Sequence, residues 1–285
     1  MDYRTLIDAS SLEAGLNVAV GGKRVLLDCR FNLMQPDAGL ALYRQGHIPG
    51  AVYAHLDKDL SSPITASSGR HPLPDPQHLA QRLGEWGICA DTQVVVYDDM
   101  GGAMAARAWW LLRWLGHERV AVLDGGFQAW VATDGAISEE AIAPIACASY
   151  PLQLQPGWVV GTEAVVANLQ KPLFSLVDAR SLERFRGEQE PIDPVAGHVP
   201  GALNRPLPDN LTTTGRFKSA EQLRAEWLAL LGEVQPEAVV AMCGSGVTAC
   251  HLLLSLELAG LPGARLYAGS WSEWIRDVGR PVATV

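Results

Sequence analysis

A cysteine that follows an apolar run is the residue of this chain best placed to do chemistry. Residues 238–242 are apolar, Cys243 comes next, and a loop with Gly244 and Gly246 leads into a second apolar stretch. A strand, a tight glycine loop and a helix form the edge where open α/β sheets bind ligands. Inward-pointing N–H groups and the helix dipole favour an anion there. The pattern therefore predicts that Cys243 is a nucleophile with a lowered thiol pKa.

The other four cysteines are scattered along the chain, and we expect them to be reduced structural residues. They are Cys29, Cys89, Cys147 and Cys250. A buried, inert position is the ordinary role of a cysteine. The chain has no CxxC pair, and no cluster of His and Cys has the spacing of zinc ligands. This usage indicates a reduced, cytoplasmic protein.

The chain repeats itself, and the repeat indicates what must position Cys243. Four segments of the first half return in the same order in the second half: 25–30 as 175–180, 46–51 as 197–202, 94–98 as 239–243, and 123–130 as 267–274. Two homologous domains explain this order. We expect the domains to cover residues 1–135 and 158–285. An Ala-, Pro- and Ser-rich linker over 136–157 joins them.

Each half alternates short apolar runs with helix-length amphipathic stretches. Residues 93–97 read as a strand buried on both faces, and residues 220–231 read as a helix. This alternation predicts an α/β fold in which each domain is a parallel β-sheet with helices on both faces. At the end of the repeated central strand, the first half has Asp98 where the second half has Cys243. A duplicated protein often keeps its chemistry in one copy, so we expect the first domain to be catalytically silent.

These features resemble the tandem-domain rhodanese family of sulfurtransferases over nearly the whole chain. The paired GHxPGA segments, the LDGGFxAW stretch of residues 123–130 and the Cys243 loop carry the resemblance. It implies that Cys243 carries sulfur as a persulfide. Members that use 3-mercaptopyruvate have Gly and Ser after the cysteine, as in Gly244 and Ser245, whereas members that use thiosulfate have Arg and Lys. The expected reaction moves sulfur from 3-mercaptopyruvate to cyanide or to a thiol, such as thioredoxin or a small thiol, and releases pyruvate; thiosulfate is the alternative donor.

The resemblance also implies a proton relay to Ser245. Mercaptopyruvate leaves as a pyruvate enolate, which needs a proton that a hydroxyl can supply or pass on. In the family, a His and an Asp of the N-terminal domain reach across the interdomain cleft to this Ser. The matching positions here are His71 and Asp57, with Asp59 as the alternative to Asp57.

Arginines and the remaining loop residues are the expected substrate-binding groups. Arg184 matches the family's substrate arginine, Arg186 lies beside it, and a guanidinium suits bidentate capture of a carboxylate. The loop contributes Gly244, Gly246, Val247 and Thr248 to the expected substrate-binding set. Many mercaptopyruvate-using members have a second Arg at the position of Asp193. This departure weakens the expected donor preference, and Arg186 and Arg70 are candidates to replace that arginine.

Composition and missing motifs exclude several other classes. A net charge of -9 argues against nucleic acid as a partner. No apolar run is long enough to span a membrane, and residues 1–11 do not read as a secretory signal. We expect no metal and no other cofactor, because neither a metal-ligand cluster nor a nucleotide-binding glycine motif is present.

Two functions outside the sulfurtransferases compete with this interpretation. Cysteine-dependent phosphatases share a rhodanese-like fold, but the Arg that they need after the nucleophile is Ala249 here. A non-catalytic binding or persulfide-carrier module is the second alternative. The intact Cys243 loop argues against it.

Overall fold

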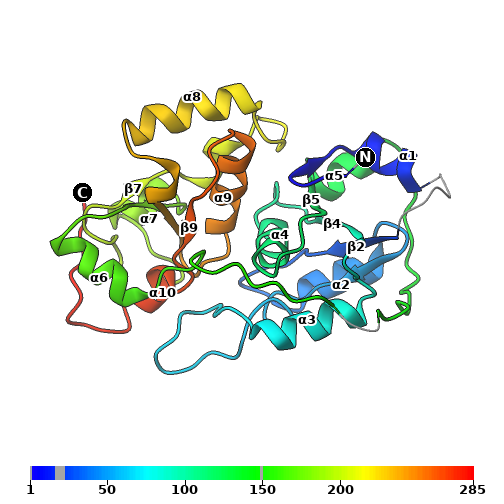
Figure 1. The fold of residues 1–285 in the computed structure, drawn as a ribbon, viewed down its shortest axis with the longest axis horizontal. Coiled ribbons are helices and arrows are strands. Elements are labelled where there is room, and N and C mark those ends of the chain that lie inside the picture. The colour runs from blue at the N-terminus through cyan, green and yellow to red at the C-terminus, as the bar shows by residue number, and fades with distance from the viewer. Residues whose placement is uncertain (1, 17–22, 148–149) are drawn as a thin grey trace. The chain divides into compact units, whose positions relative to one another are not determined.

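The protein forms two compact units, each built around its own sheet (Figure 1). The computed structural model describes residues 2–16, 23–147 and 150–285. The first unit comprises residues 1–62, 74–155 and 213–216, and the second comprises residues 63–73, 156–212 and 217–285. Segment 63–73, which the sequence places in the first domain, thus packs with the second unit. Among the described residues, no helix has the length and apolar character needed to cross a membrane.

The first unit contains a five-stranded sheet in which all pairs are parallel. Its strands, in sheet order, are β1 (Leu6–Ile7), β5 (Val120–Leu123), β4 (Gln93–Tyr97), β2 (Arg24–Asp28) and β3 (Ala51–Tyr53). The helices are α1 (Ala9–Leu16), α2 (Ala38–Gln45), α3 (Pro76–Glu85), α4 (Ala105–Trp114) and α5 (Gly126–Val131). Helix α3 begins at Pro76 because the side chain of Asp75 caps it by accepting hydrogen bonds from the backbone N–H groups of Gln77 and His78.

The second unit repeats the core of this arrangement with a four-stranded parallel sheet. Its strands, in sheet order, are β7 (Leu203–Asn204), β6 (Ser175–Asp178), β8 (Val239–Met242) and β9 (Arg265–Leu266). The helices are α6 (Thr162–Gln170), α7 (Leu182–Arg186), α8 (Ala220–Leu231), α9 (Ala249–Leu258) and α10 (Ser270–Trp274), with 3-10 turns η1 (Leu207–Asn210) and η2 (Pro236–Ala238). Strand β8 takes the place of β4 in the first unit, so the predicted repeat and fold class are confirmed.

Both faces of each sheet are covered, as the apolar strands predict. In the first unit, side chains from α1, α2 and α5 cluster with alternate strand residues such as Val95 and Tyr97. The intervening residues Val94 and Val96 point to the other face and are equally buried, where α4 contacts the sheet. In the second unit, α6 and α10 cover one face, and α9 contacts β8 and β9.

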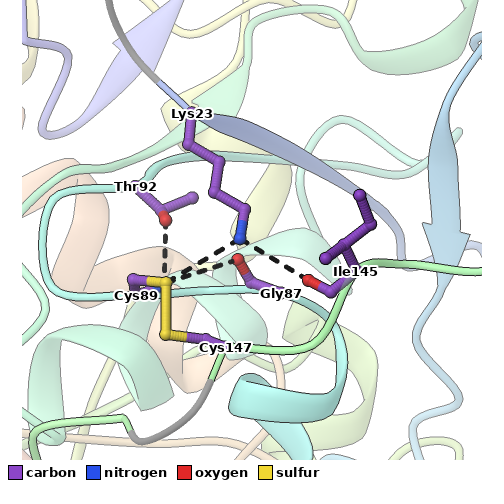
Figure 2. The surroundings of a disulfide bond; sticks show 6 residues. All are labelled: Lys23, Gly87, Cys89, Thr92, Ile145 and Cys147. Carbon is purple, nitrogen blue, oxygen red and sulfur yellow. Dashed lines mark hydrogen bonds between the residues drawn. A yellow bond between two sulfur atoms is a disulfide. The ribbon is translucent and has the colours of Figure 1, made fainter.

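A disulfide joins Cys89 and Cys147 (Figure 2), which corrects the expectation that both are reduced core residues. Their Cα atoms lie 5.7 Å apart although 58 residues separate them in the chain. Lys23 Nζ lies 3.8 Å from the Cys89 sulfur and 3.5 Å from the Ile145 carbonyl oxygen. No local motif marks such a pair, because only tertiary folding brings the two segments together. Cys29, Cys243 and Cys250 are buried thiols that are not part of a disulfide.

Removing this disulfide is expected to lower the stability of the first unit. A cross-link between residues 58 apart contributes about 4 kcal/mol through the entropy of the unfolded chain. Urea unfolding with and without dithiothreitol should show a lower midpoint under reduction. The Cys89→Ser/Cys147→Ser variant should unfold at that lower midpoint and be insensitive to the reductant. Equal midpoints for the oxidised and reduced wild type would contradict a stabilising disulfide.

Candidate active site

Cys243 sits where the sequence predicts, between a buried strand and a helix. It follows β8 directly and is 2% exposed, and α9 starts at Ala249. Its backbone N–H donates to Ser270 Oγ at 3.1 Å, and its carbonyl accepts the Trp271 N–H at 3.0 Å. The Gly246 N–H donates to the Cys243 sulfur at 3.1 Å. The loop therefore directs a backbone N–H group at the sulfur.

One loop position requires glycine, and a second glycine is closely approached by arginine side chains. Gly246 has a φ of +77°, and a Cβ there would collide with the Ala268 carbonyl oxygen. At Gly244, a Cβ would lie 2.9 Å from Arg70 Nη2 and 3.6 Å from Arg184 Nη2. The close approach at Gly244 therefore places two guanidinium groups against the loop that carries the nucleophile.

The equivalent loop of the first unit is filled by its own carboxylate. Four backbone N–H groups donate to Asp98 at 2.7–2.9 Å, those of Met100, Gly102, Met104 and Ala105. Asp98 is fully buried, so these bonds satisfy both of its oxygens without water. The loop that follows the central strand thus binds an anion attached to its first residue. In the second unit, Cys243 occupies the position of Asp98.

His71 and Ser245 are brought into direct contact. His71 Nδ1 and Ser245 Oγ lie 2.7 Å apart, and both residues are buried. His71 reaches the loop because segment 63–73 belongs to the second unit. The pair has the geometry for proton exchange between an imidazole and a hydroxyl.

The two candidate acids of the relay lie in the first unit. Asp59 accepts the His55 N–H at 2.8 Å and forms an ion pair with Arg82 at 3.1 Å, so it has a structural role. The backbone N–H of Asp57 donates to His55 Nδ1 at 3.1 Å. The participation of Asp57 in the relay stays a prediction.

Asp193 forms ion pairs with both Arg184 and Arg70. From the sequence, Arg70 was only a candidate to replace the arginine that other family members have at position 193. The carboxylate forms an ion pair with Arg70 and lies 3.2 Å from Arg184 Nη2. Arg184 also contacts Glu190 at 2.7 Å. Burial raises the pKa of Asp193, although Arg70 opposes that shift. Burial also acts to raise the pKa of Glu190, but hydrogen bonds from Arg184 hold it below its usual value.

The remaining predicted substrate residues divide between the loop and the surface. Gly244, Gly246, Val247 and Thr248 form the turn between β8 and α9. Arg186 has a side chain 44% exposed, and its ion-pair partner is Glu188 at 3.9 Å. Within the described residues, no recorded contact brings Arg186 to the Cys243 loop.

Ser270 is a positioning residue that sequence reasoning missed. Its φ of +54° is unusual for a residue with a side chain, and the repeat places Gly126, with a φ of +60°, at the equivalent position. Such a conformation costs on the order of 1–3 kcal/mol. The hydroxyl accepts the Cys243 N–H and donates to the Tyr267 carbonyl oxygen at 2.8 Å. The serine that replaces glycine at this position was the available signal.

Two substitutions of Ser270 are expected to distinguish the energetic cost of its backbone conformation from its effect on the position of the Cys243 loop. Ser270→Ala keeps the strained φ and leaves the buried Cys243 N–H without its acceptor, which should cost about 1–3 kcal/mol. Ser270→Gly removes the same bond but relieves the backbone, so it should be the more stable variant. Both should lose sulfur-transfer activity by similar factors. Full activity in both variants, measured beside their unfolding free energies, would rule out the positioning role.

Comparison with known proteins yields a consistent set of similarities. The model of the rhodanese-like domain matches residues 12–133 and 162–277. A probable 3-mercaptopyruvate sulfurtransferase of Pseudomonas aeruginosa is 51% identical, over 100% of this chain and 99% of its own. A thiosulfate sulfurtransferase of Rattus norvegicus is 35% identical, over 96% and 93%. The structure of 3-mercaptopyruvate sulfurtransferase from Leishmania major superposes with a TM-score of 0.84 at 30% identity, covering 95% of this chain and 74% of that one.

Proposed function

This chain belongs to the family of proteins with rhodanese-like domains, and from that premise we propose that it is a sulfurtransferase using 3-mercaptopyruvate. The observation that carries the proposal is the hydrogen bond between His71 and Ser245, two residues after a buried cysteine. A donor that leaves as an enolate needs a proton source at this place, whereas a donor that leaves as sulfite does not. The pair supplies that source.

The first half-reaction transfers one sulfur atom to Cys243. The thiolate attacks the sulfur of mercaptopyruvate, the carbon–sulfur bond breaks, and its electron pair forms the pyruvate enolate. The enolate takes up a proton through Ser245 and His71 and leaves as pyruvate. Cys243 then holds a persulfide whose outer sulfur came from the donor.

The Asp98 loop of the first unit supports the proposal that the Cys243 loop of the second unit stabilises a persulfide. The carboxylate oxygens of Asp98 lie two bonds from Cβ, the same separation as the outer sulfur of a cysteine persulfide. That loop surrounds this anionic position with four N–H donors. We propose that Cys243 presents its outer sulfur to the corresponding N–H groups of the second unit. The first domain, with Asp98 in this place, is silent.

The donor's carboxylate is proposed to bind Arg184 and Arg70 beside Gly244. Both guanidinium groups approach this glycine, and Asp193 lies between them. Asp193 neutralises part of their charge, which suits a donor with one carboxylate better than a dianion. Thiosulfate is the second candidate donor, because two cations still face the loop.

Donor preference tests this proposal directly. We expect kcat/KM for 3-mercaptopyruvate to exceed that for thiosulfate by at least about tenfold, or about 1.4 kcal/mol in transition-state stabilisation. Introducing Arg at Gly244 and Lys at Ser245 should shift the preference toward thiosulfate. Steady-state rates with one shared acceptor give both numbers. Equal efficiency in the wild type would remove mercaptopyruvate as the preferred donor while leaving sulfur transfer standing.

A thiol acceptor and a cytoplasmic location complete the proposal. The acceptor is a protein thiol such as thioredoxin or a small thiol, and both are kept reduced in the cytoplasm. The same reducing conditions act on the disulfide between Cys89 and Cys147. We expect a fraction of the protein in cells to carry these residues as thiols, which alkylation before lysis would count.

A further inference from the structure

A pocket of about 340 Å³ lies beside the Cys243 loop, and its Arg276 side has no assigned role in the donor half-reaction. Its walls include Arg70, Ile192, Asp193, Ser272, Ile275 and Arg276. Ser272 ties the pocket to the loop, because its N–H donates to the Gly244 carbonyl oxygen at 2.8 Å and its Oγ accepts the Arg70 N–H at 3.1 Å. The volume is within the range of small-molecule sites.

The charges of the pocket favour an anionic ligand. Asp193 is already bound to Arg70 and Arg184, so its charge is largely balanced. Arg276 donates from Nε to the Ser68 carbonyl oxygen at 3.1 Å, which orients its guanidinium. Among the described residues, this is the one hydrogen bond recorded for the Arg276 side chain. The pocket therefore presents a cation whose remaining N–H groups can bind a carboxylate.

The apolar walls define the rest of the ligand. Ile192 and Ile275 line the pocket together with the charged groups. Aliphatic walls next to a guanidinium suit a carboxylate carried on a short hydrocarbon chain. The pocket shares Arg70 with the place proposed for the donor's carboxylate, but within the described part of the chain its lining extends to Arg276 and does not include Arg184.

We infer that this pocket binds the sulfur acceptor, and that the acceptor class is a small thiol carrying a carboxylate. The inference rests on the proposed function, in which the acceptor enters after pyruvate has left. The acceptor thiolate attacks the outer sulfur of the Cys243 persulfide. The sulfur–sulfur bond breaks, its electron pair returns to the Cys243 sulfur as thiolate, and the acceptor leaves as a persulfide. No oxidant or reductant is consumed.

The test isolates this second half-reaction. Enzyme loaded with mercaptopyruvate and freed of donor is discharged in a single turnover by two matched pairs of thiols. One pair is 3-mercaptopropionate and 2-mercaptoethanol, and the longer pair is 6-mercaptohexanoate and 6-mercaptohexanol. Two chain lengths are used because the distance from the pocket to the outer sulfur on Cys243 decides which length of acceptor fits. Rates are compared per thiolate. In at least one pair, the carboxylate thiol should react at least about threefold faster, the size expected of a partly exposed charge pair.

Arg276→Gln should remove this preference and leave two other quantities unchanged: loading by mercaptopyruvate and discharge to the neutral thiols. The matched control is Arg224→Gln, an exposed arginine of α8 that also donates to backbone carbonyls, those of Ala259 and Gly260. It should keep the wild-type preference.

Three outcomes would overturn the inference. In the first, the wild type shows no preference for the carboxylate thiol in either pair. In the second, Arg276→Gln loses the same factor in discharge rate with charged and neutral thiols. In the third, that variant has a higher KM for mercaptopyruvate while its preference for the carboxylate thiol is intact. If Cys243 cannot be loaded at all, the proposed function fails first. Calorimetric binding of 6-mercaptohexanoate to unloaded wild type and Arg276→Gln then decides the pocket separately, since equal affinities would refute it.

Discussion

Cys243→Ser is expected to abolish sulfur transfer, while Cys250→Ser keeps most of it. Removing a covalent nucleophile lowers turnover by on the order of 10⁴-fold or more. Cys243 ends β8 and receives an N–H bond on its sulfur, whereas Cys250 lies within α9 and donates to the Gly246 carbonyl oxygen at 3.4 Å. A hydroxyl can replace the Cys250 thiol in that bond. Steady-state assays with mercaptopyruvate on both variants give the comparison.

The pair of serine variants shares a control for folding. Both cysteines are buried, so each substitution exchanges sulfur for oxygen in a similar environment. Matching circular dichroism and unfolding midpoints would show that the activity difference is chemical. Substantial transfer by Cys243→Ser, or loss in Cys250→Ser alone, would contradict the assignment of the nucleophile.

His71→Ala is expected to lower turnover with mercaptopyruvate by about 10²–10⁴-fold, the range of general acid–base catalysis. The imidazole lies 2.7 Å from the Ser245 hydroxyl, and without it the enolate loses its proton source. Thiosulfate turnover should fall much less, because sulfite leaves without a proton. The measurement is the pair of kcat values with both donors, and His78→Ala, an exposed histidine of α3, is the control.

A double-mutant cycle sharpens this second prediction. If Ser245 and His71 act as one relay, Ser245→Ala should cost a similar factor, and the double variant should cost little more than either single change. A loss of less than about threefold for His71→Ala with mercaptopyruvate, far below the general acid–base range, would disprove the relay. The same cycle with Asp57→Asn would test the third proposed member.

The fold was predictable because local patterns and global packing agree. Strands such as Gln93–Tyr97 and Val239–Met242 are apolar at every interior position, and the structure buries them on both faces. The repeat then placed Asp98 and Cys243 at equivalent strand ends. Glycines at 244 and 246 marked the loop, and the structure shows a close approach at one and a positive φ at the other.

Features that depend on distant segments could not be predicted in the same way. The disulfide and the bridge from Arg70 through Asp193 to Arg184 form only after folding, and no spacing rule links their members. Arg186 illustrates the converse. Arg184 faces the loop, but helix positions that are two residues apart point in different directions. Arg186 therefore reaches the surface.

Cys243 is the proposed carrier of the transferred sulfur. Mass spectrometry of the enzyme after treatment with 3-mercaptopyruvate in the absence of any acceptor, followed by digestion without reductant, tests this role. We expect one added sulfur atom on the peptide that contains Cys243, and its loss when a thiol is then supplied. An added sulfur on the peptides of Cys29 or Cys250 instead, or no added sulfur while pyruvate is released in a stoichiometric burst, would contradict the role of Cys243.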